Sequence, residues 1–228
     1  MATVAGLVPF TTIDFPGYLA AVVFFKGCPL RCPFCHNPDL QENDGKGEME
    51  WKDILSFLST RTGKIDGVVL SGGEPLMQPD IVDLVHQIKE MGFKVGLHTS
   101  GVYPEKLRQM AQDVDWVGLD IKAPWNKYDT LCGRPKMADK VKESLLFLLD
   151  QGIAFEARTT CDPAGLVPED IAAIAKELKG VGVKTYAMQH YRTFKGDKNP
   201  PEQSAINRFF KEDALTPIKA LFPDLIIR

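Results

Sequence analysis

The chain has 228 residues, of which 44% are hydrophobic and 25% are charged, a composition that predicts one globular domain over residues 1–228. The net charge is only −3 and the basic residues are scattered, which argues against a nucleic-acid partner. No stretch approaches the ~20 apolar residues that span a bilayer, and the five cysteines do not form a secreted disulfide framework, so we expect a cytoplasmic protein with no membrane partner.

Short apolar runs alternate with longer amphipathic stretches along the whole chain. Strands are predicted at residues 19–25, 67–70, 94–98, 116–121, 154–159 and 185–188. Helical spacing predicts helices near residues 81–88, 141–149 and 171–178, with weaker helices at 51–58 and 104–110 and helical segments within 204–221. The apolar residues 225–227 are too few to assign.

Six strand-then-helix units predict a parallel sheet with its helices outside. Right-handed crossovers would curl this sheet into an incomplete (β/α)6 barrel of the TIM type. The pattern alone leaves an open doubly wound sheet as an alternative.

Three cysteines at Cys28, Cys32 and Cys35 have CxxxCxxC spacing, and Pro33 keeps them off a helix. A loop of this kind predicts a 4Fe-4S cluster with three thiolate ligands and one iron open to another ligand, since such clusters usually take four thiolates. The alternatives are a zinc site, with His36 as a strained fourth ligand, or three unrelated buried cysteines. The two cysteines left over are expected to be buried or incidental; they are Cys132 and Cys161.

Polar clusters follow the predicted strands in a regular way, and in barrel enzymes the carboxyl ends of the strands carry the active site. We therefore expect one rim to hold the cysteines and the polar residues that end the later strands. These residues are Ser71, Gly72, Gly73, Glu74, His98, Thr99, Asp120, Lys122, Arg158 and His190.

The cysteine motif after the first strand and Gly-Gly-Glu-Pro after the second resemble the radical S-adenosylmethionine (SAM) superfamily over nearly the whole chain. The resemblance implies a single radical SAM domain, with SAM chelating the open iron and cleaved to a 5′-deoxyadenosyl radical. It also implies that residues 71–74 receive the SAM amino group, with Glu74 balancing its charge, and that Phe34 lies near the adenine. Gly72 and Gly73 would let the backbone approach this ligand closely.

Asp120-Ile121-Lys122 and Thr99-Ser100-Gly101 are similar to motifs of glycyl-radical-enzyme activases. This likeness implies that Lys122 acts in catalysis beside SAM together with Asp120. It also implies that Thr99 and Asp120 help hold a monovalent cation, although His98 stands where pyruvate formate-lyase activases carry Asp. By the same likeness, Arg158 would approach the SAM carboxylate and His190 the ribose hydroxyls.

The opening segment, residues 10–17, and the cysteine loop most resemble the activating proteins of anaerobic ribonucleoside-triphosphate reductase. The implied partners are that glycyl-radical enzyme and a flavodoxin or ferredoxin-type electron donor. An alternative is a radical SAM enzyme acting on a small molecule, similar to 7-carboxy-7-deazaguanine synthases. A noncatalytic iron–sulfur or zinc-binding protein is a further alternative.

Overall fold

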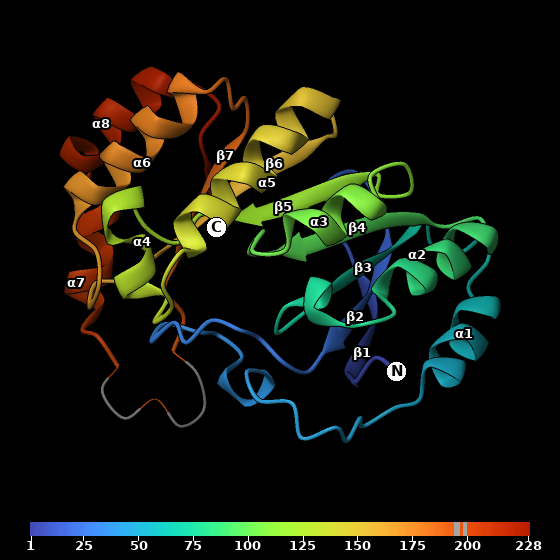
Figure 1. The fold of residues 1–228 in the computed structure, drawn as a ribbon. Coiled ribbons are helices and arrows are strands. Elements are labelled where there is room, and N and C mark those ends of the chain that lie inside the picture. The colour runs from blue at the N-terminus through green and yellow to red at the C-terminus, as the bar shows by residue number, and fades with distance from the viewer. Residues whose placement is uncertain (194–196, 198–199) are drawn as a thin grey trace.

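In the computed structural model, which describes residues 1–193, 197 and 200–228, the strands form one eight-stranded sheet in chain order (Figure 1). The strands are β1 (Val4–Thr11), β2 (Ala20–Phe25), β3 (Gly67–Gly72), β4 (Lys94–Thr99), β5 (Trp116–Asp120), β6 (Phe155–Cys161), β7 (Tyr186–His190) and β8 (Ile226–Ile227). β1 is antiparallel to β2, and every later pair is parallel.

Helices connect the parallel strands and cover the outer face of the sheet (Figure 1). They are α1 (Trp51–Ser59), α2 (Ile81–Glu90), α3 (Pro104–Gln109), α4 (Trp125–Leu131), α5 (Met137–Gln151), α6 (Pro168–Gly180), α7 (Gln203–Asn207) and α8 (Glu212–Leu221). In the part of the chain that the structure describes, no helix is long and apolar enough to cross a membrane.

The sheet is an incomplete barrel, as predicted. Its strand order runs from β1 to β8 without the reversal that a doubly wound sheet requires, so the open doubly wound alternative is wrong. β1 and β8 stand at opposite ends of this order and do not pair with each other, so the barrel does not close.

All six predicted strands are present, and their bounds differ from the predictions by three residues or fewer. The sequence pattern missed β1 because Gly6 and Pro9 interrupt its alternation, and an edge strand tolerates such residues. It also missed α4, a short helix with few apolar residues. The unassigned residues near the C-terminus form β8, which pairs with β7.

The concave face of the sheet is plugged at the amino ends of the strands by Phe15, from the connection between β1 and β2. Its ring lies 4.8 Å from the ring of Tyr18 and 6.0 Å from that of Trp116. Gly67 and Gly96 face this ring, and a Cβ at either position would press against it. Phe15 and the apolar side chains around it fill the half of the barrel interior at the amino ends of the strands. The half at the carboxyl ends of the strands is left for polar side chains.

Replacing this plug should destabilise the protein. Phe15 is 1% exposed, and Phe15→Ala should lower the free energy of unfolding by about 3–5 kcal/mol because the sheet cannot collapse around the lost ring. Phe10, which is 55% exposed in the neighbouring β1, provides the matched control in Phe10→Ala. Denaturant unfolding of the two variants measures the difference, and equal losses would contradict this account of the core.

Candidate active site

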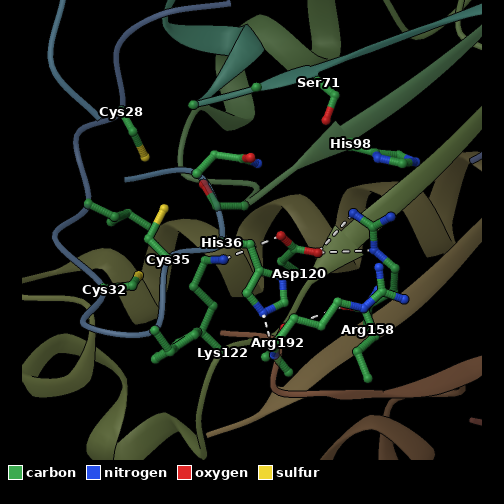
Figure 2. A pocket seen from close by; sticks show the side chains of 18 of the residues that line it. Cys28, Cys32, Cys35, His36, Ser71, His98, Asp120, Lys122, Arg158 and Arg192 are labelled. Atoms are coloured by element: carbon green, nitrogen blue, oxygen red, sulfur yellow. Dashed lines mark hydrogen bonds and ion pairs between the residues drawn. The ribbon is translucent and has the colours of Figure 1, made fainter. Parts of the chain in front are cut away.

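A cavity of about 450 Å³ opens at the carboxyl ends of the strands, between the sheet and the cysteine loop (Figure 2). Its volume lies in the range typical of small-molecule sites. Among the residues singled out from the sequence, those lining this cavity are Cys28, Cys32, Phe34, Cys35, His36, Ser71, Gly72, Gly73, His98, Thr99, Asp120, Lys122, Arg158 and His190. Residues separated by more than 160 positions in the chain therefore share one site.

The three cysteines lie on an irregular loop after β2, as predicted from Pro33. The loop is held from both sides by backbone hydrogen bonds: Cys28 N donates to Gln41 O at 2.9 Å and Arg31 N donates to Cys132 O at 2.9 Å. Figure 2 shows the three thiols facing the same side of the loop. Cys32 is buried, while Cys28 and Cys35 are half-buried.

The arrangement of the thiols differs from that of a mononuclear metal site. Within the described residues, no three His, Cys, Asp or Glu side chains converge closely enough to hold one ion, as zinc at about 2.0–2.3 Å would require. The ring of the suggested fourth ligand, His36, instead packs edge-on to Tyr191, and its Nε2 lies 3.4 Å from the Arg192 backbone nitrogen. Three thiols that face one side of a loop without converging on a single point fit a cluster of several irons.

Burial and, to a smaller extent, the nearby Glu74 carboxylate raise the pKa of the Cys28 thiol to about 12. Without a positive partner this sulfur therefore stays protonated at neutral pH. Thiolate ligation would need the charge of a bound metal to overcome that preference.

The glycine-rich segment after β3 packs against the strand that leads to the cysteines. A Cβ at Gly72 would overlap the backbone of Phe25, and one at Gly73 would overlap the carbonyl oxygen of Gly27. Gly73 N donates to Phe25 O at 2.9 Å, and Glu74 N donates to Gly27 O at 2.8 Å. These glycines thus permit close approach between two backbone segments, whereas the sequence suggested close approach to a ligand.

Glu74 does not line the cavity, although the sequence predicted a direct ligand contact for it. Its carboxylate is fully buried and accepts hydrogen bonds from the Thr99 hydroxyl at 2.7 Å, from Ser100 N at 2.8 Å and from Leu76 N at 3.1 Å, with a further bond from the Ser100 hydroxyl. Burial raises the pKa of Glu74, and these donors oppose that effect. Glu74 therefore fastens the end of β3 to the end of β4.

Asp120 is the centre of a charged network in the cavity (Figure 2). Its Oδ1 lies 2.8 Å from Arg158 Nη2 and 3.0 Å from Arg158 Nε, and its Oδ2 lies 3.3 Å from Lys122 Nζ. Burial alone would raise the pKa of Asp120, but the two cations lower it to about 2.

The second cation of this network keeps its charge. Burial lowers the pKa of Lys122, but Asp120 and the neighbouring thiols raise it more, so it stays well above its ordinary value. Two cations around one carboxylate leave an excess positive charge, which favours an anionic ligand group. Lys122 Nζ also lies 5.9 Å from the centre of the Phe34 ring, which joins the network to the cysteine loop.

The sequence analysis missed Gly118, which makes room for Arg158. A Cβ at Gly118 would lie 2.5 Å from Arg158 Nη1, and the Gly118 carbonyl accepts a hydrogen bond from Arg158 Nη2 at 3.1 Å. Alternation along β5 places Gly118 on the same face as Asp120, so the strand period could have indicated an inward-facing glycine.

His98 is neutral in this site. Burial lowers its pKa to about 3, and Arg158 adds to the effect. The ring Nε2 lies 2.9 Å from the Asp14 carbonyl oxygen, which can only accept, so Nε2 carries the proton. His98 therefore fastens the β1–β2 connection to the end of β4. It supplies no negative charge at the position where pyruvate formate-lyase activases carry Asp.

Three further features of the cavity concern its opposite wall. The His190 ring stacks on Phe210 with its centre 3.6 Å from that of the partner ring. Arg192 and Arg228 also line the cavity, and neither was predicted. Arg192 follows His190 on the same rim, so extending the strand-end rule by two residues would have found it. Arg228 forms two ion-pair contacts with buried Glu156, at 2.6 and 2.9 Å, and no local pattern indicates that pairing.

Comparisons with known proteins agree on one family. The chain matches the Radical SAM superfamily over residues 22–162. A Methanocaldococcus jannaschii protein, provisionally named a glycyl-radical enzyme activating enzyme, is 33% identical over 199 residues, covering 83% of this chain and 80% of that protein. The pyruvate formate-lyase-activating enzyme of Clostridium pasteurianum is 37% identical over 115 residues, covering 48% of each chain.

Solved structures share the fold. Streptococcus suis SuiB bound to S-adenosylmethionine superposes with a TM-score of 0.68 at 16% identity, covering 88% of this chain and 47% of SuiB. A domain of the pyruvate-formate lyase-activating enzyme from Bacteroides vulgatus has a TM-score of 0.56 at 15% identity, covering 72% of this chain and 99% of that domain. The chain thus spans about half of SuiB, and at these identities the likeness concerns the fold alone.

The close approach of Gly118 and Arg158 can be tested directly. Gly118→Ala should displace the guanidinium from Asp120 and lower the free energy of unfolding by about 1–3 kcal/mol, because the added methyl group overpacks the site. Adding Arg158→Ala should relieve the overlap, so the two losses should not add.

Gly180→Ala, at a position with open space around it, is the matched control and should be close to neutral. Denaturant unfolding of the four variants measures the coupling. Additive losses would show that Gly118 does not make room for Arg158.

Proposed function

We propose that this chain, which belongs to the radical SAM superfamily, activates a glycyl-radical enzyme, with anaerobic ribonucleoside-triphosphate reductase as its partner. One observation carries the proposal: three cysteine thiols and the charged network of Asp120 face a single cavity at the carboxyl ends of the strands. We assign residues 1–228 to one radical SAM domain, because a single sheet extends beyond both ends of the matched region.

The cysteine loop fits a 4Fe-4S cluster. Cys28, Cys32 and Cys35 would hold three irons and leave the fourth facing the cavity, where SAM would bind. When bound, the cluster and SAM supply the electron and the 5′-deoxyadenosyl group that carry out hydrogen abstraction. The loop would position the cluster, because its backbone hydrogen bonds to Gln41 and Cys132 fix the orientation of the three thiols.

The residues of the rim would orient SAM. We place its amino group beside Ser71, Gly72 and Gly73, which line the cavity next to the cysteine loop. We propose that the SAM carboxylate binds beside the Asp120 network, whose two cations leave an excess positive charge. Lys122, 18% exposed and between Asp120 and Phe34, is the group we expect to contact SAM directly.

Two predicted contacts, those of Arg158 and Glu74 with SAM, are replaced by positioning roles in this proposal. Arg158 is only 6% exposed, and its guanidinium already donates hydrogen bonds to the Asp120 carboxylate and the Gly118 carbonyl oxygen. We therefore propose that Arg158 positions Asp120. Glu74 likewise holds the rim together from behind the cavity wall. We keep the adenine beside Phe34 and the ribose hydroxyls beside His190, both of which line the cavity.

A monovalent cation beside Thr99 and Asp120 stays a prediction. The Thr99 hydroxyl already donates to Glu74, and neutral His98 supplies no carboxylate. Backbone and water oxygens would have to supply most of the ligands.

The unclosed barrel supports a macromolecular substrate. Because β1 and β8 do not pair, the mouth of the cavity is not ringed by strands, which leaves room for a polypeptide loop carrying the target glycine. The activating-enzyme names of the Methanocaldococcus and Clostridium relatives support the same reaction class. We further propose a cytoplasmic location and a flavodoxin or ferredoxin-type electron donor, since thiolate ligands suit a reducing compartment.

Single replacements of the loop cysteines test the cluster. Cys28→Ala, Cys32→Ala and Cys35→Ala should each abolish the iron–sulfur absorbance after anaerobic reconstitution, together with the release of 5′-deoxyadenosine from SAM under dithionite. Cys161→Ala, at a buried site in β6, is the control and should retain both. A variant of the loop that kept a full iron content and cleaved SAM would contradict the ligand assignment.

The reaction itself is tested by mixing the reduced protein and SAM with a candidate anaerobic ribonucleoside-triphosphate reductase. We expect a glycine-centred doublet in the electron paramagnetic resonance spectrum of the partner, formed only with SAM and reductant present. Conversion of a small molecule without that doublet would favour the 7-carboxy-7-deazaguanine synthase-like alternative. A full cluster that neither responds to SAM nor cleaves it would favour a noncatalytic iron–sulfur protein.

A further inference from the structure

Cys132 touches a predicted cluster ligand, although the sequence indicated an incidental cysteine. It caps the end of α4, its side chain is fully buried, and its thiol lies close enough to the thiol of Cys32 for each to perturb the pKa of the other. The other cysteine outside the loop, Cys161, contacts only the Thr159 carbonyl oxygen among its described hydrogen-bond partners. The two leftover cysteines therefore differ in their surroundings.

The backbones that carry Cys32 and Cys132 are fastened together. Arg31 N donates to Cys132 O at 2.9 Å, and Arg134 Nε donates to Pro29 O at 2.8 Å. A Cβ at Gly133 would lie 3.2 Å from Arg31 Cβ, so these segments are in van der Waals contact. A disulfide requires Cα atoms roughly 4.4–6.8 Å apart, and these contacts hold the two cysteine-bearing segments side by side.

We propose that Cys32 and Cys132 form a reversible disulfide when the protein lacks its cluster and meets a peroxide. Cys32 lines the cavity and Cys132 does not, so a peroxide in the cavity would reach the Cys32 sulfur before that of Cys132. Hydrogen peroxide oxidises the Cys32 thiol to a sulfenic acid and is reduced to water. The Cys132 sulfur then displaces the hydroxyl group, forming the S–S bond and releasing a second water, with the thiol proton leaving in that water.

The disulfide would protect the cluster site. It stops the oxidation of Cys32 before the sulfinic acid, which simple thiols cannot reverse. While it is present, Cys32 is unavailable to iron, and a dithiol reductant restores it by exchange. This inference rests on the proposed function only in taking Cys32 as a cluster ligand, because the packing of the two cysteine-bearing segments is independent of that role.

The test compares the full chain with Cys132→Ser and with the matched control Cys161→Ser. Each protein is reconstituted, its cluster is removed by a chelator under anaerobic conditions, and hydrogen peroxide is added. Intact mass and peptide mapping are then recorded before and after dithiothreitol, and iron–sulfur absorbance is measured after a second reconstitution. Circular dichroism checks that each variant is folded.

The wild-type chain and Cys161→Ser should become two hydrogens lighter, yield a peptide joining Cys32 to Cys132, and recover their absorbance after reduction. Cys132→Ser should instead gain oxygen atoms at Cys32 and recover less of its absorbance. A different disulfide pairing in the wild-type chain, or equal recovery by Cys132→Ser, would overturn the proposal. If no protein formed a cluster at any stage, the joined peptide would still decide the disulfide, while the proposed function would fail.

Discussion

The short backbone contact between the end of β2 and the glycine-rich end of β3 is the constraint on which the site depends. Gly73 and Glu74 donate to Phe25 and Gly27, and no side chain fits between these segments. This contact holds the start of the cysteine loop against the sheet. The Glu74 carboxylate extends it to the end of β4, so three consecutive strand ends act as one rigid support.

A second organising feature is the balance of charge around Asp120. The carboxylate is stabilised by Arg158 and Lys122, which together exceed its charge and leave the cavity positive. Gly118 gives Arg158 its place, while Phe15 and its neighbours exclude water from the opposite half of the interior. The charged side chains therefore lie between the apolar layer around Phe15 and the cavity, and they face the cavity.

Much of the site could be predicted because parallel strands bring their carboxyl ends to one edge. Residues such as Asp120 and His190 end strands with clear apolar patterns, and their grouping followed from that rule. The role of Glu74 could not be predicted, because its direction depends on donors from Thr99 and Ser100 on another strand. Arg228 was missed for a related reason, since its pairing with Glu156 joins positions 72 residues apart.

The sequence by itself determined the six strands β2–β7 and the longer helices between them, the loop form of the cysteine motif and the family to which the chain belongs. These follow from local chemistry: apolar periodicity, the missing amide of Pro33 and the spacing of three thiols. Only the tertiary structure decided which polar groups satisfy one another and which remain turned toward the cavity. It also separated Cys132 from Cys161, because the position of Cys132 beside the cysteine loop depends on how the end of α4 packs against that loop.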